Sequence, residues 1–117
     1  MSGQAELIDR YCDVWGEADA HRSAEKLDAV WGHGAAYTDP TVHAVGAQEL
    51  LAHIAGVRDR RPGSKVVRTT EIEIHHGMGL FSWQAVGADG AILRKGIDIV
   101  FFSADGGKIE RMIVFFT

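Results

Sequence analysis

The spacing of apolar residues changes character about halfway along the chain. Residues 4–18 repeat apolar side chains at helical intervals, which predicts an amphipathic helix. A second helical pattern begins after Ser23, a suitable N-cap, and stops near Gly32. A third covers residues 46–58. The first half of the chain therefore predicts three helices.

From Lys65 onward the period of the pattern is two residues, which indicates strands joined by glycine-containing hairpin turns. A short extended stretch over residues 35–38 adds one strand between the second and third helices, and Asp39-Pro40 closes it. The long predicted strands cover residues 65–76, 79–87, 92–103 and 108–117. The order α-α-β-α-β-β-β-β predicts an α+β fold in which helices cover one face of a curved antiparallel sheet.

Alternation sorts the last two predicted strands into faces. One face of residues 92–103 carries Arg94, Gly96, Asp98, Val100 and Phe102, and the other carries Leu93, Lys95, Ile97, Ile99 and Phe101. In the last strand, Glu110, Met112, Val114 and Phe116 oppose Ile109, Arg111, Ile113 and Phe115. Both faces are largely apolar, although the helices need only one. The surplus face predicts a homodimer formed through Ile97, Ile99 and Phe101.

Composition narrows the class of protein. A length of 117 residues with 46% hydrophobic residues fits one domain over residues 1–117 with a substantial core. A net charge of −4 without a basic stripe argues against a nucleic-acid partner. No apolar run approaches the roughly 20 residues that span a membrane. The single cysteine, Cys12, has no internal disulfide partner, which favours the cytoplasm.

Three polar residues are candidates for a catalytic role. Asp98 lies in "GIDIVFF", apolar on both sides, so its carboxyl must be paired, protonated or solvated by a cavity. Arg94, on the same face, offers an ion pair. Tyr11, on the inner face of the first helix, is either a core residue or a functional one. Asp39 is either a turn former or a base at the rim of a pocket.

Three stretches in this order, "DRYCDVWGEAD", "AYTDP" and "GIDIVFFSADGGKIERMIVFF", resemble the NTF2-like superfamily in its SnoaL-like and ketosteroid isomerase branch. The resemblance covers nearly the whole chain. It implies a cone, in which the curved sheet wraps against the helices and encloses an apolar pocket. It also implies a dimer through the outer face of the sheet.

The resemblance assigns roles to individual positions. Tyr11 corresponds to the oxyanion-binding tyrosine, Asp39 to the proton-shuttling base, and Asp98 to a neutral carboxylic acid that donates a second hydrogen bond. The implied substrate-binding residues are Trp15, Phe81, Trp83, Arg94, Val100, Met112, Val114 and Phe116.

The implied activity is proton transfer on a small apolar molecule that carries a carbonyl, as in an isomerase or a cyclase. It needs no cofactor, and the six histidines show no metal-ligand spacing. The alternative is a non-catalytic domain that binds a small ligand or dimerises as an accessory protein. A limonene-epoxide-hydrolase activity fits less well, because it needs a second carboxylate late in the chain, and the sequence ends at "VFFT" without one.

Overall fold

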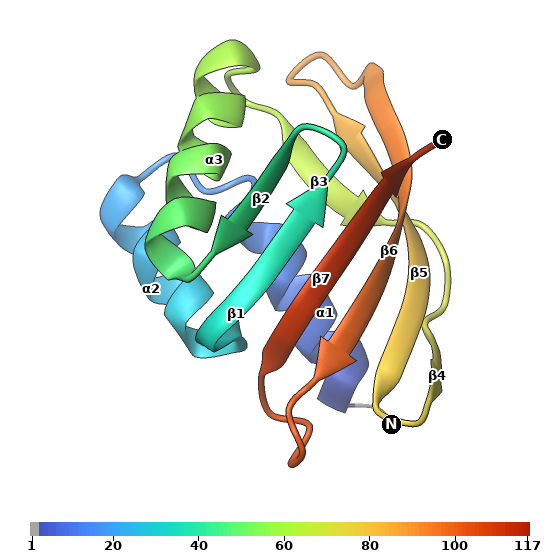
Figure 1. The fold of residues 1–117 in the computed structure, drawn as a ribbon. Helices are drawn as coiled ribbons and strands as arrows, with labels where there is room; N and C mark the ends of the chain where they lie inside the picture. Colours follow the sequence, from blue (N-terminus) through green and yellow to red (C-terminus); the bar gives the residue numbers. More distant parts are fainter. Residues whose placement is uncertain (1–2) are drawn as a thin grey trace.

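Three helices and seven strands make up the computed structural model, which describes residues 3–117 (Figure 1). The helices are α1 (Gly3–Val14), α2 (Ala20–Val30) and α3 (Ala47–Arg60). The strands are β1 (Trp31–Asp39), β2 (Val42–Val45), β3 (Lys65–Arg68), β4 (Glu73–His75), β5 (Met78–Val86), β6 (Ile92–Phe102) and β7 (Ile109–Phe116). The predicted α+β class is confirmed, with two strands more than the sequence pattern indicates.

The helix boundaries differ from the prediction at the first two helices. α1 ends at Val14, so Trp15 lies in the turn that follows. α2 begins earlier than expected, because Asp19 rather than Ser23 is its N-cap and accepts a hydrogen bond of 2.9 Å from the backbone N–H of Arg22. Ser23 lies inside the helix, is buried, and accepts a 3.3 Å hydrogen bond from Arg58 Nη1.

The two additional strands arise where local signals are short. β2 pairs with β1 in a hairpin whose turn contains Pro40, and four residues are too few for alternation to reveal them beside a helix. The segment predicted as one strand over residues 65–76 is divided into β3 and β4, and both pair with β5.

The sheet order is β2-β1-β7-β6-β5-β3, with β4 also paired to β5. All pairs are antiparallel except β1 with β7, which is parallel. The prediction of a wholly antiparallel sheet is therefore wrong at this one pair. β1 and β7 are far apart in the sequence, so no hairpin turn fixes their relative direction.

The predicted alternation of β6 is confirmed, since Gly96, Asp98, Val100 and Phe102 are buried and the residues between them are only half-buried. In β7 the prediction is wrong at the first two residues, since Ile109 is buried and Glu110 is exposed. An irregularity in the β6–β7 register opposite Phe101 and Phe102 turns Ile109 into the core.

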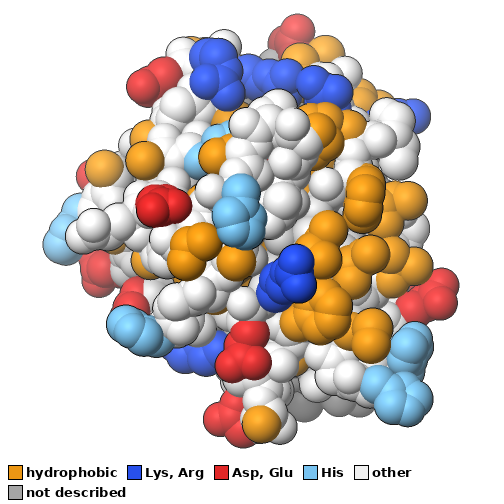
Figure 2. Space-filling view, in the orientation of Figure 1, with side chains coloured by type: hydrophobic (Ala, Val, Ile, Leu, Met, Phe, Trp, Pro, Cys, Tyr) orange, Lys and Arg blue, Asp and Glu red, His pale blue; other side chains and the backbone are white. Residues whose placement is uncertain are grey.

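The helices lie on one side of the sheet, with α1 behind the central strands and α3 beside β1 and β2 (Figure 1). Among the described residues, no helix covers the other side of the sheet. There apolar side chains gather over β5, β6 and β7 (Figure 2), and they include Leu80 and Phe115, which are 41% and 55% exposed. Within residues 3–117, none of the helices has the length and apolar character needed to cross a membrane.

Candidate functional site

A cavity of about 140 Å³ lies between the helices and the inner face of the sheet. Its walls are mainly aromatic and aliphatic, with two carboxyl groups, one histidine and three arginines. The lining residues are Tyr11, Trp15, Tyr37, Asp39, Thr41, His53, Val57, Arg60, Arg61, Val66, Trp83, Ala85, Arg94, Asp98, Val114 and Phe116.

Asp39 is held at the end of β1 by hydrogen bonds to both of its carboxylate oxygens. Oδ1 accepts from the backbone N–H of Thr41 (2.7 Å), from Thr41 Oγ1 (2.6 Å) and from the backbone N–H of Val42 (3.1 Å). Oδ2 accepts from the Tyr37 hydroxyl (2.7 Å) and lies 3.3 Å from His53 Nε2. Asp39 is therefore the turn former that its Asp-Pro sequence predicts, and it also lines the cavity.

Two opposing effects set the pKa of Asp39. Burial alone raises the pKa, but the hydrogen bonds from His53, Thr41 and Tyr37 outweigh it and hold the pKa well below its ordinary value. Asp39 is therefore an ionised acceptor at neutral pH. A carboxylate with so low a pKa is a weak base, because a general base works best with a pKa near the operating pH.

His53 projects from α3 into the aromatic part of the cavity. Its ring packs edge-on against Trp15, with 5.8 Å between ring centroids, and lies 5.6 Å from the ring of Tyr37. Its side chain is 14% exposed, and the Nε2 atom faces Asp39. When Nε2 carries the proton that bonds to Asp39, Nδ1 is the unprotonated nitrogen.

Asp98 has the opposite environment. It is 4% exposed, and its Oδ1 has no hydrogen-bond partner among the described residues. Burial raises its pKa to about 8, and the nearby charge of Asp39 adds to the rise. The indole of Trp83 opposes the rise, although its Nε1 atom lies outside hydrogen-bonding geometry. Asp98 therefore keeps its proton at neutral pH.

The ion pair between Arg94 and Asp98, which the sequence left open, does not form. The structure has no such contact among the salt bridges of residues 3–117, and the Arg94 guanidinium stacks on the ring of Phe116, 4.2 Å from its centroid. Within the part of the chain that the structure describes, Asp98 thus forms no ion pair that would favour its ionised form.

The sheet register relates the two carboxyl groups. β1 pairs Thr38 with Ile113, so the next residue, Asp39, comes alongside Val114, and Val114 pairs with Asp98. Because neighbouring strands lie about 4.8 Å apart, the Cα atoms of Asp39 and Asp98 are about 10 Å from each other. Asp39 and Asp98 therefore flank one section of the cavity wall.

Tyr11 lies deeper than the other candidate polar residues. Its ring stacks on Trp31, with 5.8 Å between centroids and 16° between planes. Burial and the charge of Asp98 raise the pKa of Tyr11 well above its ordinary value. The Tyr11 hydroxyl is thus a neutral donor at every physiological pH.

The structure brings together most of the residues singled out from the sequence. Eight of them line the cavity: Tyr11, Trp15, Asp39, Trp83, Arg94, Asp98, Val114 and Phe116. Phe81, Val100 and Met112 do not line it, although they share the inner face of the sheet. They are almost fully buried in the core, because their part of the sheet is covered by helices rather than by the cavity.

Several lining residues were not predicted, above all Tyr37, His53, Arg60 and Arg61. Tyr37 was detectable, since it lies two residues before Asp39 on the same strand and so shares its face. His53, Val57 and Arg60 recur at intervals of four and three residues along α3, but that pattern does not show that this helix face borders a cavity. Among residues 3–117 no three His, Cys, Asp or Glu side chains are grouped to hold a metal ion.

Comparison with solved structures identifies the fold. A protein of Agrobacterium tumefaciens strain C58, provisionally described as an isomerase of the SnoaL-like family, is 26% identical with a TM-score of 0.90 over 100% of this chain and 99% of its own. A provisionally described SnoaL-like polyketide cyclase of Jannaschia sp. CCS1 is 14% identical with a TM-score of 0.76, over 97% of this chain and 84% of its own.

An NTF2-like protein of unknown function from Exiguobacterium sp. 255-15 is 18% identical with a TM-score of 0.74, over 95% of this chain and 98% of its own. No protein-family model matches the sequence, and neither does any curated protein. The chain has the NTF2-like fold, and its predicted resemblance to SnoaL-like proteins is confirmed.

Proposed function

We propose that the cavity binds a small carbonyl compound and catalyses proton transfer at the carbon next to the carbonyl, as an isomerase or a cyclase does. The Asp39–His53 pair accepts the proton, and the neutral Asp98 donates a hydrogen bond to the carbonyl oxygen. The similar solved proteins that are provisionally described as an isomerase and a cyclase support this class of reaction.

The observation that carries the proposal is the opposite protonation of two carboxyl groups on one cavity wall. Proton abstraction next to a carbonyl needs a base and a donor that stabilises the developing enolate oxygen. Asp39 is held ionised, whereas Asp98 is held neutral with an unpartnered oxygen. Pairs of groups whose environments drive their pKa values apart are typical of acid–base sites.

His53 is better placed than Asp39 to take the proton. Both carboxylate oxygens of Asp39 already accept hydrogen bonds, from three donors at Oδ1 and from two at Oδ2. An ionised carboxylate bonded to Nε2 orients the imidazole and stabilises the imidazolium that forms. In this step Nδ1 of His53 takes the proton, and the C–H electron pair moves into the enolate. The enolate is then protonated at another carbon or attacks a second carbonyl.

The size of the cavity limits the substrate. An engineered cavity of about 150 Å³ in another protein accommodates benzene, so 140 Å³ holds about one six-membered ring. A molecule with several fused rings would extend out of the opening. The proposal therefore concerns a single-ring ketone or an open-chain compound of similar volume.

The test is deuterium incorporation into acetophenone and phenylacetone in heavy water, followed by proton NMR. We expect His53→Ala and Asp98→Ala each to reduce the catalysed exchange by about 100-fold or more, because base and oxyanion donors contribute effects of that order. His21→Ala is the matched control, since the His21 side chain is 86% exposed on α2.

Equal exchange rates for wild type, His53→Ala and Asp98→Ala would contradict the assigned roles. Binding of these ketones in the cavity without any exchange above buffer would instead support a ligand-binding domain that performs no turnover. Asp98→Asn is the control for misfolding of Asp98→Ala, because it keeps the size of the side chain and a hydrogen-bond donor.

A further inference from the structure

Three of the residues that line the cavity are arginines. Arg60 and Arg61 come from the end of α3, and Arg94 comes from β6. Within residues 3–117 none of the three takes part in a salt bridge. A chain with net charge −4 thus places three of its twelve cationic Lys and Arg side chains around a single apolar cavity.

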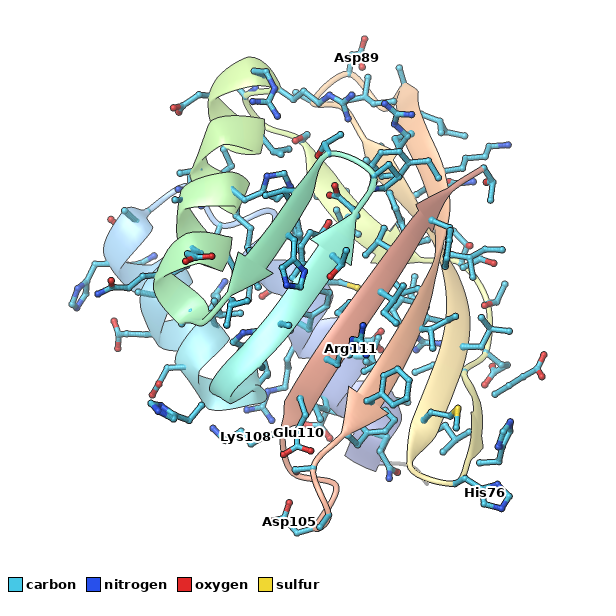
Figure 3. All side chains as sticks on the ribbon, viewed as in Figure 1. His76, Asp89, Asp105, Lys108, Glu110 and Arg111 are labelled. Carbon is cyan, nitrogen blue, oxygen red and sulfur yellow. The ribbon has the colours of Figure 1, made fainter. Side chains whose placement is uncertain are left out.

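Helix electrostatics explains part of this arrangement. Cations in the last turn of a helix offset the negative end of its dipole, which accounts for Arg58 and Arg60 on α3. It does not account for Arg94, which lies on a different element. The nearest acidic residue before Arg94 in the chain, Asp89, lies at the outer end of the β5–β6 turn and points away from the protein (Figure 3).

Arg60 and Arg94 line the cavity and are exposed, so they lie where the cavity meets the solvent. The Arg94 guanidinium lies over the ring of Phe116, which leaves its N–H edge free to bind an anion. Arg60 folds back along its own helix, where its Nη1 atom would be 3.4 Å from a Cβ placed on Gly56. Guanidinium groups bind carboxylate and phosphate groups in a bidentate manner.

The distance from this opening to Asp98 is short. Phe116, under the Arg94 guanidinium, pairs with Gly96, which is two residues from Asp98. Two residues of a strand span about 7 Å, roughly the length of one ring with substituents at opposite ends. Asp98, with its unpartnered Oδ1, is buried, whereas Arg60 and Arg94 are exposed, so the carboxyl group and these arginines lie at different depths of the cavity.

We propose that the ligand is a single-ring or similarly sized oxo acid, whose anionic group is bound by Arg60, Arg61 and Arg94 while its carbonyl reaches Asp98. This inference rests on the proposed function for the carbonyl end of the ligand. The anionic group is a carboxylate or a phosphate, which share the same guanidinium chemistry.

Isothermal titration at low salt can test the inference with three para-substituted probes: 4-acetylbenzoate, 4-acetylphenyl phosphate and the neutral methyl 4-acetylbenzoate. We expect at least one of the two anions to bind ten-fold or more tightly than the ester and to compete with it. The anion that binds more tightly shows whether the anionic group of the ligand is a carboxylate or a phosphate. Added sodium chloride should weaken binding of the anion and not of the ester.

Two variants should each remove most of the preference for the anionic probes over the ester: Arg94→Gln and the double variant Arg60→Gln/Arg61→Gln. Arg22→Gln is the matched control, because Arg22 is exposed on α2 and does not line the cavity. Equal affinity for anions and ester, binding of none of the probes, or an equal loss in Arg22→Gln would overturn the inference.

The outcome is separable from that of the proposed function. Exchange that depends on His53 and Asp98 for neutral ketones, with no preference for anions, would overturn only the inference about the arginines. A preference for anions that depends on the arginines, without any exchange, would support the anion site and contradict catalysis.

Discussion

Asp39 and Asp98 lie in one row on the inner face of the sheet, on either side of Val114, and their surroundings bias their protons in opposite directions. Burial raises the pKa of both carboxyl groups; at Asp39 the hydrogen bonds outweigh it, whereas at Asp98 burial is the largest effect. Asp39 gains five donors at a hairpin turn, whereas Asp98 lies in mid-strand, where backbone N–H groups are already paired.

Asp98→Asn should change how stability depends on pH. The unfolded chain releases the Asp98 proton near pH 4, and the folded protein holds it until about pH 8. Between these values the folded state binds one more proton, so wild-type stability falls as pH rises, by up to about 1.4 kcal/mol per pH unit. In urea unfolding from pH 5 to pH 8, the free energy of unfolding of Asp98→Asn should therefore rise relative to that of the wild type.

The control for this prediction is Asp105→Asn. The backbone N–H of Gly107 and the hydroxyl of Ser103 lower the pKa of Asp105, so it is ionised throughout this pH range. Its variant should follow the wild-type slope. An Asp98→Asn protein whose stability runs parallel to wild type would show that Asp98 is not held neutral.

Tyr37→Phe should raise the pKa of Asp39 toward its ordinary value, because it removes the 2.7 Å hydrogen bond to Oδ2. A hydrogen bond to a charged group contributes about 2 kcal/mol to folding stability, so we expect the free energy of unfolding of Tyr37→Phe at pH 7 to be lower than that of the wild type by an amount of that order. In the folded variant the pKa of Asp39 is closer to the ordinary value of about 4, so the variant takes up the Asp39 proton at a higher pH than the folded wild type, and the loss should shrink below about pH 4.

The measurement is a carbon-13 NMR titration of the Asp39 carboxyl, with urea unfolding alongside it. Tyr11→Phe is the matched control, since Tyr11 has no hydrogen bond to Asp39 and stacks instead on Trp31. A titration of Asp39 that is identical in wild type and Tyr37→Phe would refute this explanation of its low pKa.

Gly96→Ala should disturb the cavity through Trp83. The indole of Trp83 crosses β6 directly over Gly96, and an added Cβ would collide with its ring atoms. Overpacking of this kind costs about 1–3 kcal/mol. We expect a loss of stability together with a shift in tryptophan fluorescence, whereas Gly3→Ala, with open space around the added methyl, should leave the fluorescence unchanged. Unaltered fluorescence in Gly96→Ala would mean that Trp83 does not cross this glycine.

The sequence predicted the parts of the fold that depend on long periodic segments. Alternation along residues 92–102 placed Asp98 on the inner face with Gly96 and Val100, and the structure agrees. It could not predict β2, which has four residues, or the register irregularity that turns Ile109 inward. A bulge is determined by pairing with the neighbouring strand, which periodicity within one strand does not report.

The candidate site was predictable only in part, for a similar reason. Asp39 and Asp98 were recognisable from the resemblance to a known family. His53 comes next to Asp39 only because α3 packs against β1 and β2, which is a tertiary relationship. The ion pair that sequence allowed between Arg94 and Asp98 fails because Phe116, from another strand, offers its aromatic face to the arginine.

The outer face of the sheet carries the prediction of a homodimer. Leu80 and Phe115 remain 41% and 55% exposed there, beside the half-buried Ile97, Ile99 and Phe101. Large contiguous apolar patches are typical of interaction surfaces. Light scattering during size exclusion should give twice the monomer mass at micromolar concentration, and Phe115→Glu should shift the protein toward monomer. Val45→Glu is the matched control, because Val45 is 47% exposed but lies on β2, away from this surface. A wild-type monomer under these conditions would mean that the apolar face is left exposed to solvent or covered by a different partner.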